Sequence, residues 1–374
     1  MKYSKNILSK ILLGILVGSV ISGIVFTHFN SIPPLMNKDE QEFAILAMSL
    51  ENKPYIVYSP LATGHTTLYF YTILSSFQEF GFNTFGLRIP SAVSGVMGGL
   101  VFFALMLLVY HKKGDRSLWL AFATTLLFIT LRWYFSFARF AFEATFLLMF
   151  ELFSLLFILW YQRSRKTYFL ILSGIFAGLA FHSYTPGRIF FLVPLVALAH
   201  ELMKEKLTRK RLMPSLVYLG TVALVALPLV LYLSTNTDTR IYQQFFITNE
   251  QLSIVLRIQY LFENVIKNIG MLFFRGDVNG IHNYPYKPAL NPFVSILFVF
   301  GFVLSIKNWR NLTNQVFLAF FLISMAPTIF TYPWENPHML RTFTVIPAIV
   351  FFFSRSIEFL ISRFKLRSKF VMGV

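Results

Sequence analysis

The sequence predicts an all-α polytopic membrane protein, a bundle of about ten transmembrane helices with two outer-face loops that contain interfacial helices. Three observations support this prediction: the composition, the length of the apolar runs and the position of the basic residues. Of 374 residues, 56% are hydrophobic and 13% are charged, about half the charged fraction of ~25% that is typical of soluble domains. Such a chain cannot cover itself with polar surface in water, which excludes a soluble globular domain and a disordered chain.

Apolar runs of the length needed to cross a bilayer recur along the whole chain. A span needs about 20 mostly apolar residues, and the candidates are residues 11–29, 89–110, 117–131, 141–161, 168–184, 189–203, 214–233, 292–306, 315–330 and 342–361. The third, sixth and eighth runs are shorter than the others. The first run exceeds the 7–15-residue apolar region of a signal peptide and is interpreted as an uncleaved anchor.

The basic residues follow the same topology. The formal net charge is +17, and with a cytoplasmic N-terminus most of the 33 Lys and Arg residues fall in the N-terminus, the inside loops and the C-terminus. The outer segments carry most of the 16 acidic residues. This asymmetry is the positive-inside pattern. It predicts that both termini are cytoplasmic, and it explains the basic excess without a nucleic-acid partner.

Two long outer segments, about 28–88 and about 234–291, concentrate the polar residues. In the first, Asn37 predicts the N-cap of a helix over 38–50. In the second, apolar residues recur at helical spacing over 249–274, which predicts an amphipathic helix at the interface. We expect residues 1–374 to form a single membrane domain without a separate C-terminal soluble domain. The chain has no P-loop and no GxGxxG motif, so nothing indicates use of ATP or a dinucleotide.

Three outer-face carboxylates are candidate catalytic groups. Asp39 and Glu40 begin the first outer helix, where Glu40 at the third helical position could simply close a capping box with Asn37. Asp39 has no comparable structural role. Glu143 lies in the first turn of the fourth span, where an acid is costly and is therefore a functional candidate. The alternative for Glu143 is a local ion pair with Arg139.

Basic side chains of the outer face form the second half of a candidate site. They are His65, Arg88, Arg139, Arg188, Lys287, His338 and Arg341. Any one of them could simply extend toward lipid phosphates at the interface. As a group they could bind an anionic headgroup close to the carboxylates.

Several motifs together resemble the membrane glycosyltransferases that use polyprenyl-phosphate sugars: glycosyltransferase family 39, the protein O-mannosyltransferase-like proteins and the lipid A aminoarabinose transferases. The motifs, in the order typical of this family, are Asp39-Glu40 with Phe43-Ala44, Gly64-His65-Thr66-Thr67-Leu68, Leu87-Arg88-Ile89-Pro90-Ser91, and the segments 136–143, 183–188, 276–283 and 336–341. The resemblance covers nearly all of the chain.

The resemblance implies the all-helical GT-C fold, a lipid-phosphate sugar donor, and transfer to an acceptor hydroxyl on the non-cytoplasmic face. Asp39 matches the proposed general base with Glu40 as its neighbour, and Glu143 stands where relatives often carry Asp. We expect the donor phosphate to be bound by His65, Arg139, Arg188 and Arg341, with Arg88, Lys287, His338 and Asp277 as secondary candidates. A phosphate leaves without a general acid, so one carboxylate base and several cations suffice for an inverting single displacement.

Two departures from the family pattern limit what is carried over. Thr66-Thr67 replace the paired prolines that follow the basic residue in relatives. Gly64 stands where the aminoarabinose transferases have a metal-binding Glu, so the sequence does not support a divalent metal. The acceptor is a hydroxyl on a protein, a lipid or a cell-wall polymer. The alternative functions are a non-enzymatic lipid-sugar carrier or flippase and a catalytically silent scaffold.

Overall fold

The computed structural model describes residues 2–114, 116–203 and 209–364. Within these ranges the protein is almost entirely helical, and its helices are α1 (Lys2–Phe26), α2 (Lys38–Ser49), α3 (Leu68–Phe80), α4 (Thr84–Tyr110), α5 (Arg116–Thr130), α6 (Arg132–Phe137), α7 (Glu143–Ser164), α8 (Thr167–Phe181), α9 (Leu192–Leu202), α10 (Arg209–Thr235), α11 (Thr239–Gln244), α12 (Ile254–Phe273), α13 (Pro292–Lys307), α14 (Leu312–Ile329) and α15 (Ile346–Arg363). Five short 3-10 helices, η1 (His111–Lys113), η2 (Thr185–Ile189), η3 (Phe246–Thr248), η4 (Pro333–Glu335) and η5 (Phe343–Val345), connect them. The only strands in the described ranges, β1 (Tyr58–Ser59) and β2 (His65–Thr66), form an antiparallel hairpin.

The apolar helices coincide with the predicted spans. Six are long and apolar enough to cross a membrane: Thr84–Lys113, Glu143–Ser164, Thr185–Leu202, Arg211–Thr235, Leu312–Ile329 and Phe343–Arg363. Four shorter ones, Leu13–Phe26, Arg116–Thr130, Thr167–Phe181 and Pro292–Lys307, account for the remaining predicted runs. The short sixth run reaches spanning length because η2 precedes α9. The all-α multi-pass membrane fold is thus confirmed, while the crossing of all ten runs stays a prediction.

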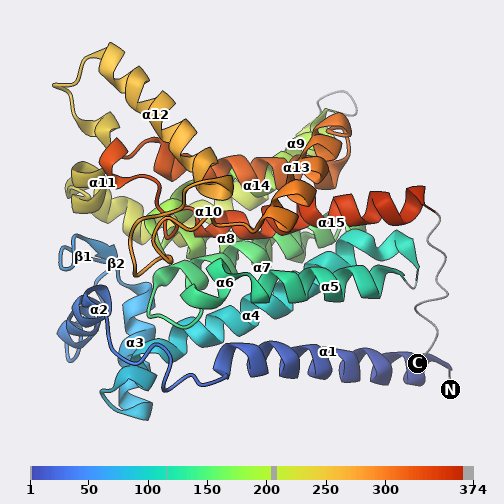
Figure 1. Cartoon of the computed structure of the whole chain (residues 1–374), viewed down its shortest axis with the longest axis horizontal. Helices are drawn as coiled ribbons and strands as arrows, with labels where there is room; N and C mark the ends of the chain where they lie inside the picture. Colours follow the sequence, from blue (N-terminus) through green and yellow to red (C-terminus); the bar gives the residue numbers. More distant parts are fainter. Residues whose placement is uncertain (1, 115, 204–208, 365–374) are drawn as a thin grey trace.

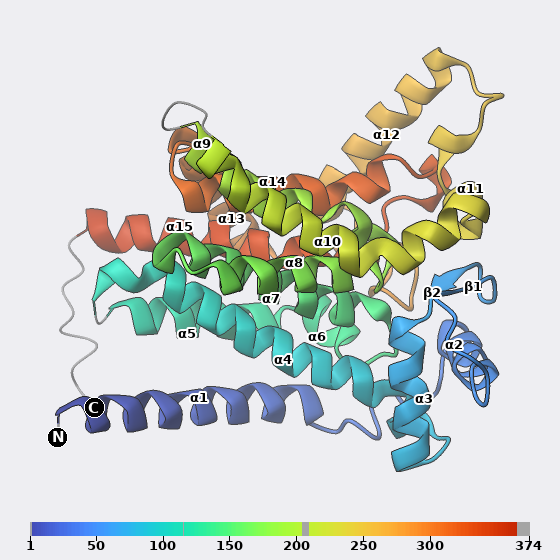
Figure 2. The same cartoon turned by 180° about the vertical axis from the view of Figure 1, so that it is seen from behind.

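The long helices run roughly along one axis of the molecule (Figure 1). The central helix α7 is the most buried of the candidate spans and packs against α4 and α8. The start of α1 and the end of α15 lie at one end of the bundle, and α2, α3, the β-hairpin and α11 gather at the other (Figures 1 and 2). The inside segments predicted over 204–208 and 365–374 lie outside the described residues. The bundle thus has one end with few extra elements and one end that carries both long loops.

The predicted loop helices are present. Helix α2 begins after Asn37, and a capping box joins the Asn37 side chain to the Glu40 amide and the Glu40 side chain to the Asn37 amide. The predicted amphipathic helix is α12, which projects from the body (Figure 2). Ile254, Val255 and Phe262 on its apolar side are 70–77% exposed, whereas its buried residues include Asn264. The apolar side of α12 therefore faces away from the protein, as expected of a helix that lies in an interface.

Three helices and the hairpin were not predicted. Helix α3 follows directly on the hairpin, α6 is a six-residue turn before α7, and α11 is a six-residue helix after α10. Helix α4 begins at Thr84, earlier than the predicted residue 89, because Asn83 accepts a hydrogen bond from the Gly86 amide and caps it. Pro90 lies in the second turn of this helix, where it does not end the helix. These short elements position the polar side chains of the outer loops.

Candidate active site

A cavity of about 210 Å³ opens at the end of the bundle that carries the two long loops. Its walls come from segments far apart in the sequence: α2, the hairpin, the first turn of α7, α11, the loop after α12 and the loop after α14. The charged or titratable side chains in the lining are Asp39, Glu42, His65, Glu143, Tyr184, Arg240, His282, Glu335, His338 and Arg341. The two long outer segments, which the sequence predicts to concentrate polar residues, thus meet in one site.

Asp39 is the carboxylate most available for chemistry. The capping box of α2 fixes where the helix starts and turns Glu40 into the protein, so the preceding Asp39 lines the cavity, half-buried. Burial and the nearby Glu42 raise the pKa of the Asp39 carboxyl above its usual value, although His282 opposes this shift. Within the described residues, no hydrogen bond or ion pair engages its oxygens. A carboxylate with a raised pKa and free oxygens suits a general base.

Glu40, predicted as a second catalytic carboxylate, has a structural position instead. It is fully buried, and its Oε1 lies 2.7 Å from Arg88 Nε and accepts a hydrogen bond of 3.0 Å from the Ala141 amide. Its Oε2 accepts from Arg88 Nη2 at 2.8 Å and from the Asn37 amide at 3.2 Å. Arg88 donates its remaining hydrogen bonds to the carbonyls of residues 33 and 35. Neither Glu40 nor Arg88 is among the residues that line the cavity, so the structure does not bring them together with the other predicted site residues.

Glu143 lines the cavity and pairs with His65, not with Arg139. The His65 Nδ1 contacts Glu143 Oε1, and both side chains are 1% exposed. The other ring nitrogen, Nε2, lies 2.8 Å from the Ala62 carbonyl. Burial, together with the positive charge of Arg240, lowers the pKa of His65. Both nitrogens of the His65 ring are thus engaged by Glu143, the Ala62 carbonyl and Arg240, so the ring is not free to bind a phosphate as the structure stands.

The predicted cation Arg139 is occupied inside the protein. Its guanidinium donates to the carbonyls of Val25 at 2.8 Å and Ile32 at 2.7 Å, and it lies over the rings of Phe29 and Phe135. Only 2% of Arg139 is exposed, and it is absent from the cavity lining. Arg139 therefore joins the end of α1 to the segment before α7, and the alternative considered for Glu143, an ion pair with Arg139, is not formed.

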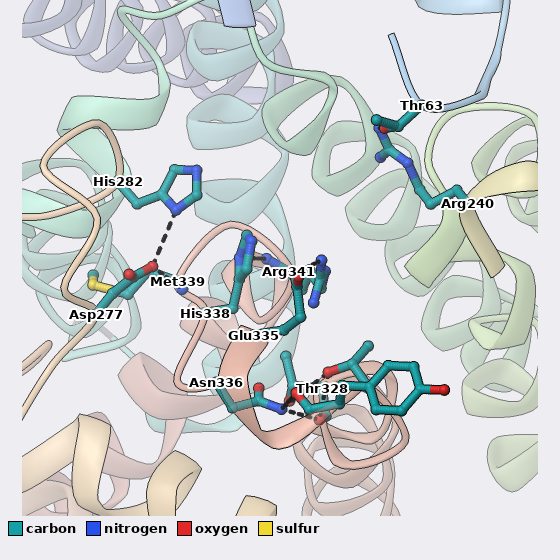
Figure 3. Close-up of polar contacts among 12 residues, drawn as sticks. Thr63, Arg240, Asp277, His282, Thr328, Glu335, Asn336, His338, Met339 and Arg341 are labelled. Atoms are coloured by element: carbon teal, nitrogen blue, oxygen red, sulfur yellow. Dashed lines mark hydrogen bonds and ion pairs between the residues drawn. The ribbon is translucent and has the colours of Figure 1, made fainter. Parts of the chain in front are cut away.

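Two arginines do face the cavity. Arg341 donates to Glu335 Oε2 at 2.8 Å, and its second terminal nitrogen, Nη1, is buried without a hydrogen-bond partner in the described structure. Arg240 contacts the His65 ring and lies over the ring of Tyr184, 5.5 Å from its centroid. Figure 3 shows Arg240 across from Arg341 and His338. Two guanidinium groups on opposite walls suit a bound phosphate.

Sequence reasoning missed Arg240 because α11, the short helix that carries it, has no periodic signal. Its N-cap, Asp238, accepts a hydrogen bond from the Ile241 amide and is paired with Arg188 and with the Tyr58 hydroxyl. Burial alone would raise the pKa of the Asp238 carboxyl, but Arg188 and these hydrogen bonds hold it below its usual value. Arg188, predicted as a phosphate ligand, is thus absent from the lining and helps to position α11.

Of the remaining predicted residues, one is exposed to solvent and the others lie at or behind the cavity wall. Lys287 is exposed and does not line the cavity. His338 lines the cavity, and Asp277 lies directly behind it, next to His282. One ligand atom from each of Asp277, His282 and His338 falls within 4.8 Å of the others, which makes them a cluster able to hold a metal ion. His282 was not among the residues singled out from the sequence.

The conformation of the hairpin requires glycine at position 64. Its φ of +96° lies in the region that favours glycine. A Cβ at this position would lie 2.2 Å from the Tyr58 hydroxyl oxygen, which is itself bonded to Asp238. The wall of the cavity at the hairpin therefore has no room for a side chain at 64.

The sequence and the fold of the chain are each similar to those of known proteins. Residues 55–240 match the sequence model of the dolichyl-phosphate-mannose-protein mannosyltransferase family. No curated protein sequence matches the chain at a significant level.

Among solved structures, the fold is similar to ArnT from Cupriavidus metallidurans bound to undecaprenyl phosphate, with a TM-score of 0.56, 14% identity, and coverage of 94% of this chain and 60% of that one. It is also similar to the oligosaccharyltransferase AglB from Archaeoglobus fulgidus in complex with an inhibitory peptide and a dolichol-phosphate, with a TM-score of 0.59, 13% identity, and coverage of 97% and 52%. The chain thus spans 52–60% of the length of these two proteins.

Proposed function

We propose that this chain, whose residues 55–240 match the dolichyl-phosphate-mannose-protein mannosyltransferase family, is a glycosyltransferase of that kind. Its fold is that of the GT-C proteins. In this proposal it transfers a monosaccharide from a polyprenyl-phosphate donor to an acceptor hydroxyl on the non-cytoplasmic face. The observation that carries this proposal is the cavity in which Asp39 faces two arginines from other segments. The fold neighbours are complexes with undecaprenyl phosphate and with dolichol-phosphate. They support a lipid-phosphate donor.

The chemistry follows from the charges in the cavity. Arg240 and Arg341 bind the donor phosphate and stabilise the negative charge that builds up on it as the sugar leaves. The acceptor hydroxyl attacks the anomeric carbon, the bond from that carbon to the phosphate oxygen breaks, and the hydroxyl proton passes to Asp39. One displacement inverts the anomeric centre. The products are a glycoside, a polyprenyl phosphate and a protonated Asp39, which returns its proton to solvent.

Two features support placing the cavity on the outer face. The opposite end of the bundle carries basic side chains from several connecting segments, including Lys112, Arg163 and Arg165, which is the positive-inside pattern. At the cavity end, the exposed apolar side of α12 suits insertion among lipid headgroups. A polyprenyl phosphate with its chain in the bilayer would then present its phosphate close to the headgroup plane, next to the cavity.

The test is a transfer assay on the purified protein in nanodiscs. Radiolabelled polyprenyl-phosphate hexoses and pentoses are supplied one at a time with candidate acceptor peptides, lipids or glycans, and free and transferred sugar are separated. We expect one donor to give product with the wild type and Asp39→Asn to lower turnover, while the exposed-acid control Glu51→Gln stays at the wild-type rate. Equal turnover in Asp39→Asn and the wild type would contradict the proposed mechanism. Movement of intact lipid-linked sugar across the bilayer without transfer would favour a carrier.

A further inference from the structure

A second cavity, of about 410 Å³, lies at the end of the bundle opposite the candidate active site. It opens where the ends of α4, α7 and α9 meet the start of α14. Figures 1 and 2 show α9 ending at the same end of the molecule at which α1 begins. The proposed transfer reaction does not use this cavity, which we call the basic cavity after the side chains that line it.

The basic cavity lies at the level where helices leave the membrane. Four candidate spans, those that contain α4, α7, α9 and α14, end or begin beside it. Trp119, Trp160 and Trp309 are 41–55% exposed, and each lies in or next to a terminal turn of a helix at this end. Exposed tryptophans concentrate at the boundary between acyl chains and headgroups. The cavity is therefore at the depth of the lipid headgroups.

The positive charge of the basic cavity is only partly compensated within the described residues. Its lining contains Lys112, Arg163 and Arg165, together with the carboxylate of Glu201. Glu201 Oε2 accepts a hydrogen bond of 2.7 Å from Arg165 Nη2. Arg163 donates to the uncharged carbonyl of Leu108, and no carboxylate forms an ion pair with Arg163 or Lys112 in the part of the chain that the structure describes. Two cations thus remain available to an anion.

Uncharged donors stand beside these cations. The Oδ1 of Asn311 caps α14 by accepting from the amides of Thr313 and Asn314, which leaves the side-chain NH₂ of Asn311 able to donate. The Thr313 hydroxyl has no hydrogen-bond partner in the described structure. His111 contacts Arg163 through Nδ1 and keeps the guanidinium at the cavity. The start of the 18-residue helix α14 adds partial positive charge to the same wall.

The inner wall of the basic cavity is apolar, and this feature decides which kind of anion fits. It is formed by Leu108, Val109, Leu159 and Leu312. A free phosphate ion gains nothing from an apolar wall, whereas the glycerol and first methylene groups of a lipid lose contact with water there. The position at headgroup depth, the uncompensated cations and the apolar wall together fit an amphipathic ligand with an anionic head.

We propose that the basic cavity binds the phosphodiester headgroup of an anionic phospholipid from the leaflet at this end of the bundle. Arg163 and Lys112 bind the phosphate oxygens, and the Thr313 hydroxyl and the Asn311 amide donate to the remaining headgroup oxygens. The apolar wall contacts the glycerol and the start of the acyl chains. Because one lipid then contacts the ends of four helices and binds only the native state, it raises the stability of the bundle.

Lipid binding is measured on the purified protein in detergent by native mass spectrometry. The lipid-depleted wild type is titrated with dioleoyl phosphatidylglycerol and, separately, with dioleoyl phosphatidylcholine, which has the same acyl chains and a zwitterionic headgroup. We expect phosphatidylglycerol to bind more tightly and to raise the midpoint of thermal unfolding. Lys112→Gln and Arg163→Gln should each lower the affinity for phosphatidylglycerol about fivefold, and the double variant about 25-fold.

The matched control is Arg116→Gln/Lys307→Gln, which removes two exposed cations that do not line the cavity. It should bind phosphatidylglycerol as the wild type does. Equal affinities of the wild type for the two lipids would overturn the proposal. Equal losses in the cavity and control double variants would also overturn it, because they would indicate general attraction to a basic surface.

Inorganic phosphate separates a lipid from a free anion as the ligand. Displacement of phosphatidylglycerol by an equal concentration of inorganic phosphate would refute the lipid site. Lys112→Gln breaks no hydrogen bond in the described structure, so if the double variant does not fold, Lys112→Gln compared with Lys307→Gln decides. The measurement involves no sugar transfer, so its outcome does not depend on the proposed function.

Discussion

Asp39 and Glu40 are adjacent carboxylates that the structure places in opposite environments, so exchanging each for its amide tests the proposed base most directly. Asp39 lines the cavity without a hydrogen-bond partner in the described structure, whereas Glu40, on the buried face of α2, is 0% exposed. Asp39→Asn and Glu40→Gln change size very little and remove one negative charge each. We expect the first to lower turnover and the second to lower stability.

The two magnitudes follow from the contacts. Asp39→Asn removes no hydrogen bond, so stability should stay within about 0.5 kcal/mol of the wild type, while loss of the proton acceptor should lower turnover by roughly 10²–10⁴-fold. Glu40→Gln places an NH₂ group where one carboxylate oxygen now accepts hydrogen bonds, and it leaves the buried Arg88 without its counter-charge. Breaking a buried ion pair on one side costs about 3–5 kcal/mol. This exceeds the ~1 kcal/mol expected of a helix cap alone.

The assay measures both quantities on the same preparations. Turnover is taken from the nanodisc transfer assay and stability from thermal unfolding in detergent. The double variant Glu40→Gln/Arg88→Met serves as a control, because removing the unpaired charge should recover part of the lost stability. An active Asp39→Asn beside an inactive but stable Glu40→Gln would exchange the two roles. Full turnover in both would refute the carboxylate base in the first outer loop and make Glu143 the next candidate.

Three further predictions address the cations, the pH dependence and the topology. Arg341→Ala and Arg240→Ala should each weaken donor use about ten- to a hundredfold, since a hydrogen bond to a charged group is worth roughly 1.5–3 kcal/mol; unchanged kinetics in both would move the phosphate elsewhere. Because the pKa of Asp39 is raised, the base becomes protonated and activity falls at a higher pH than for an ordinary Asp, and an acid limb at the usual Asp value in the rate profile would contradict this. The chain has no native cysteine, so Asn279→Cys should react with an impermeant maleimide added to intact cells and Lys112→Cys should not; the reverse result would invert the topology.

The sequence offered the capping box of α2 as one interpretation of Glu40, because that motif is local. It gave no sign of the ion pair that Glu40 forms with Arg88. Asn37 and Glu40 are three residues apart, and both hydrogen bonds of the box lie within one helical turn. The Glu40–Arg88 pair joins residues 48 positions apart and depends on how α2 packs beside α4. The spacing of apolar residues along the chain does not show which helices pack against each other. Glu40, a candidate catalytic acid in the sequence, is therefore found in a buried ion pair with a residue of another helix.

The contacts of the outer-face arginines could not be predicted from the sequence either. From the sequence, Arg139, Arg188 and Arg341 were all candidate phosphate ligands, because each lies in a polar segment between apolar runs. In the structure Arg139 donates hydrogen bonds to carbonyls at the end of α1, and Arg188 forms an ion pair with Asp238. Arg240, in a helix too short to give a periodic pattern, reaches the cavity instead. Which cation stays available depends on the carbonyls and carboxylates that distant segments bring to it.

An anion can therefore bind in this protein where an arginine is not already paired with carboxylates or carbonyls. A buried guanidinium that already donates to carboxylates or carbonyls, such as that of Arg88, gains little from a phosphate, because the phosphate would have to displace hydrogen bonds of similar strength. Arg341 differs, since within the described residues its guanidinium donates only to Glu335, whose side chain is 34% exposed. That pair opens at lower cost, because an exposed carboxylate regains hydration when released. The donor phosphate should thus take the place of Glu335 at Arg341. Glu335→Gln is accordingly expected to bind the donor at least as tightly as the wild type, and weaker binding would show that Glu335 positions Arg341 for the phosphate.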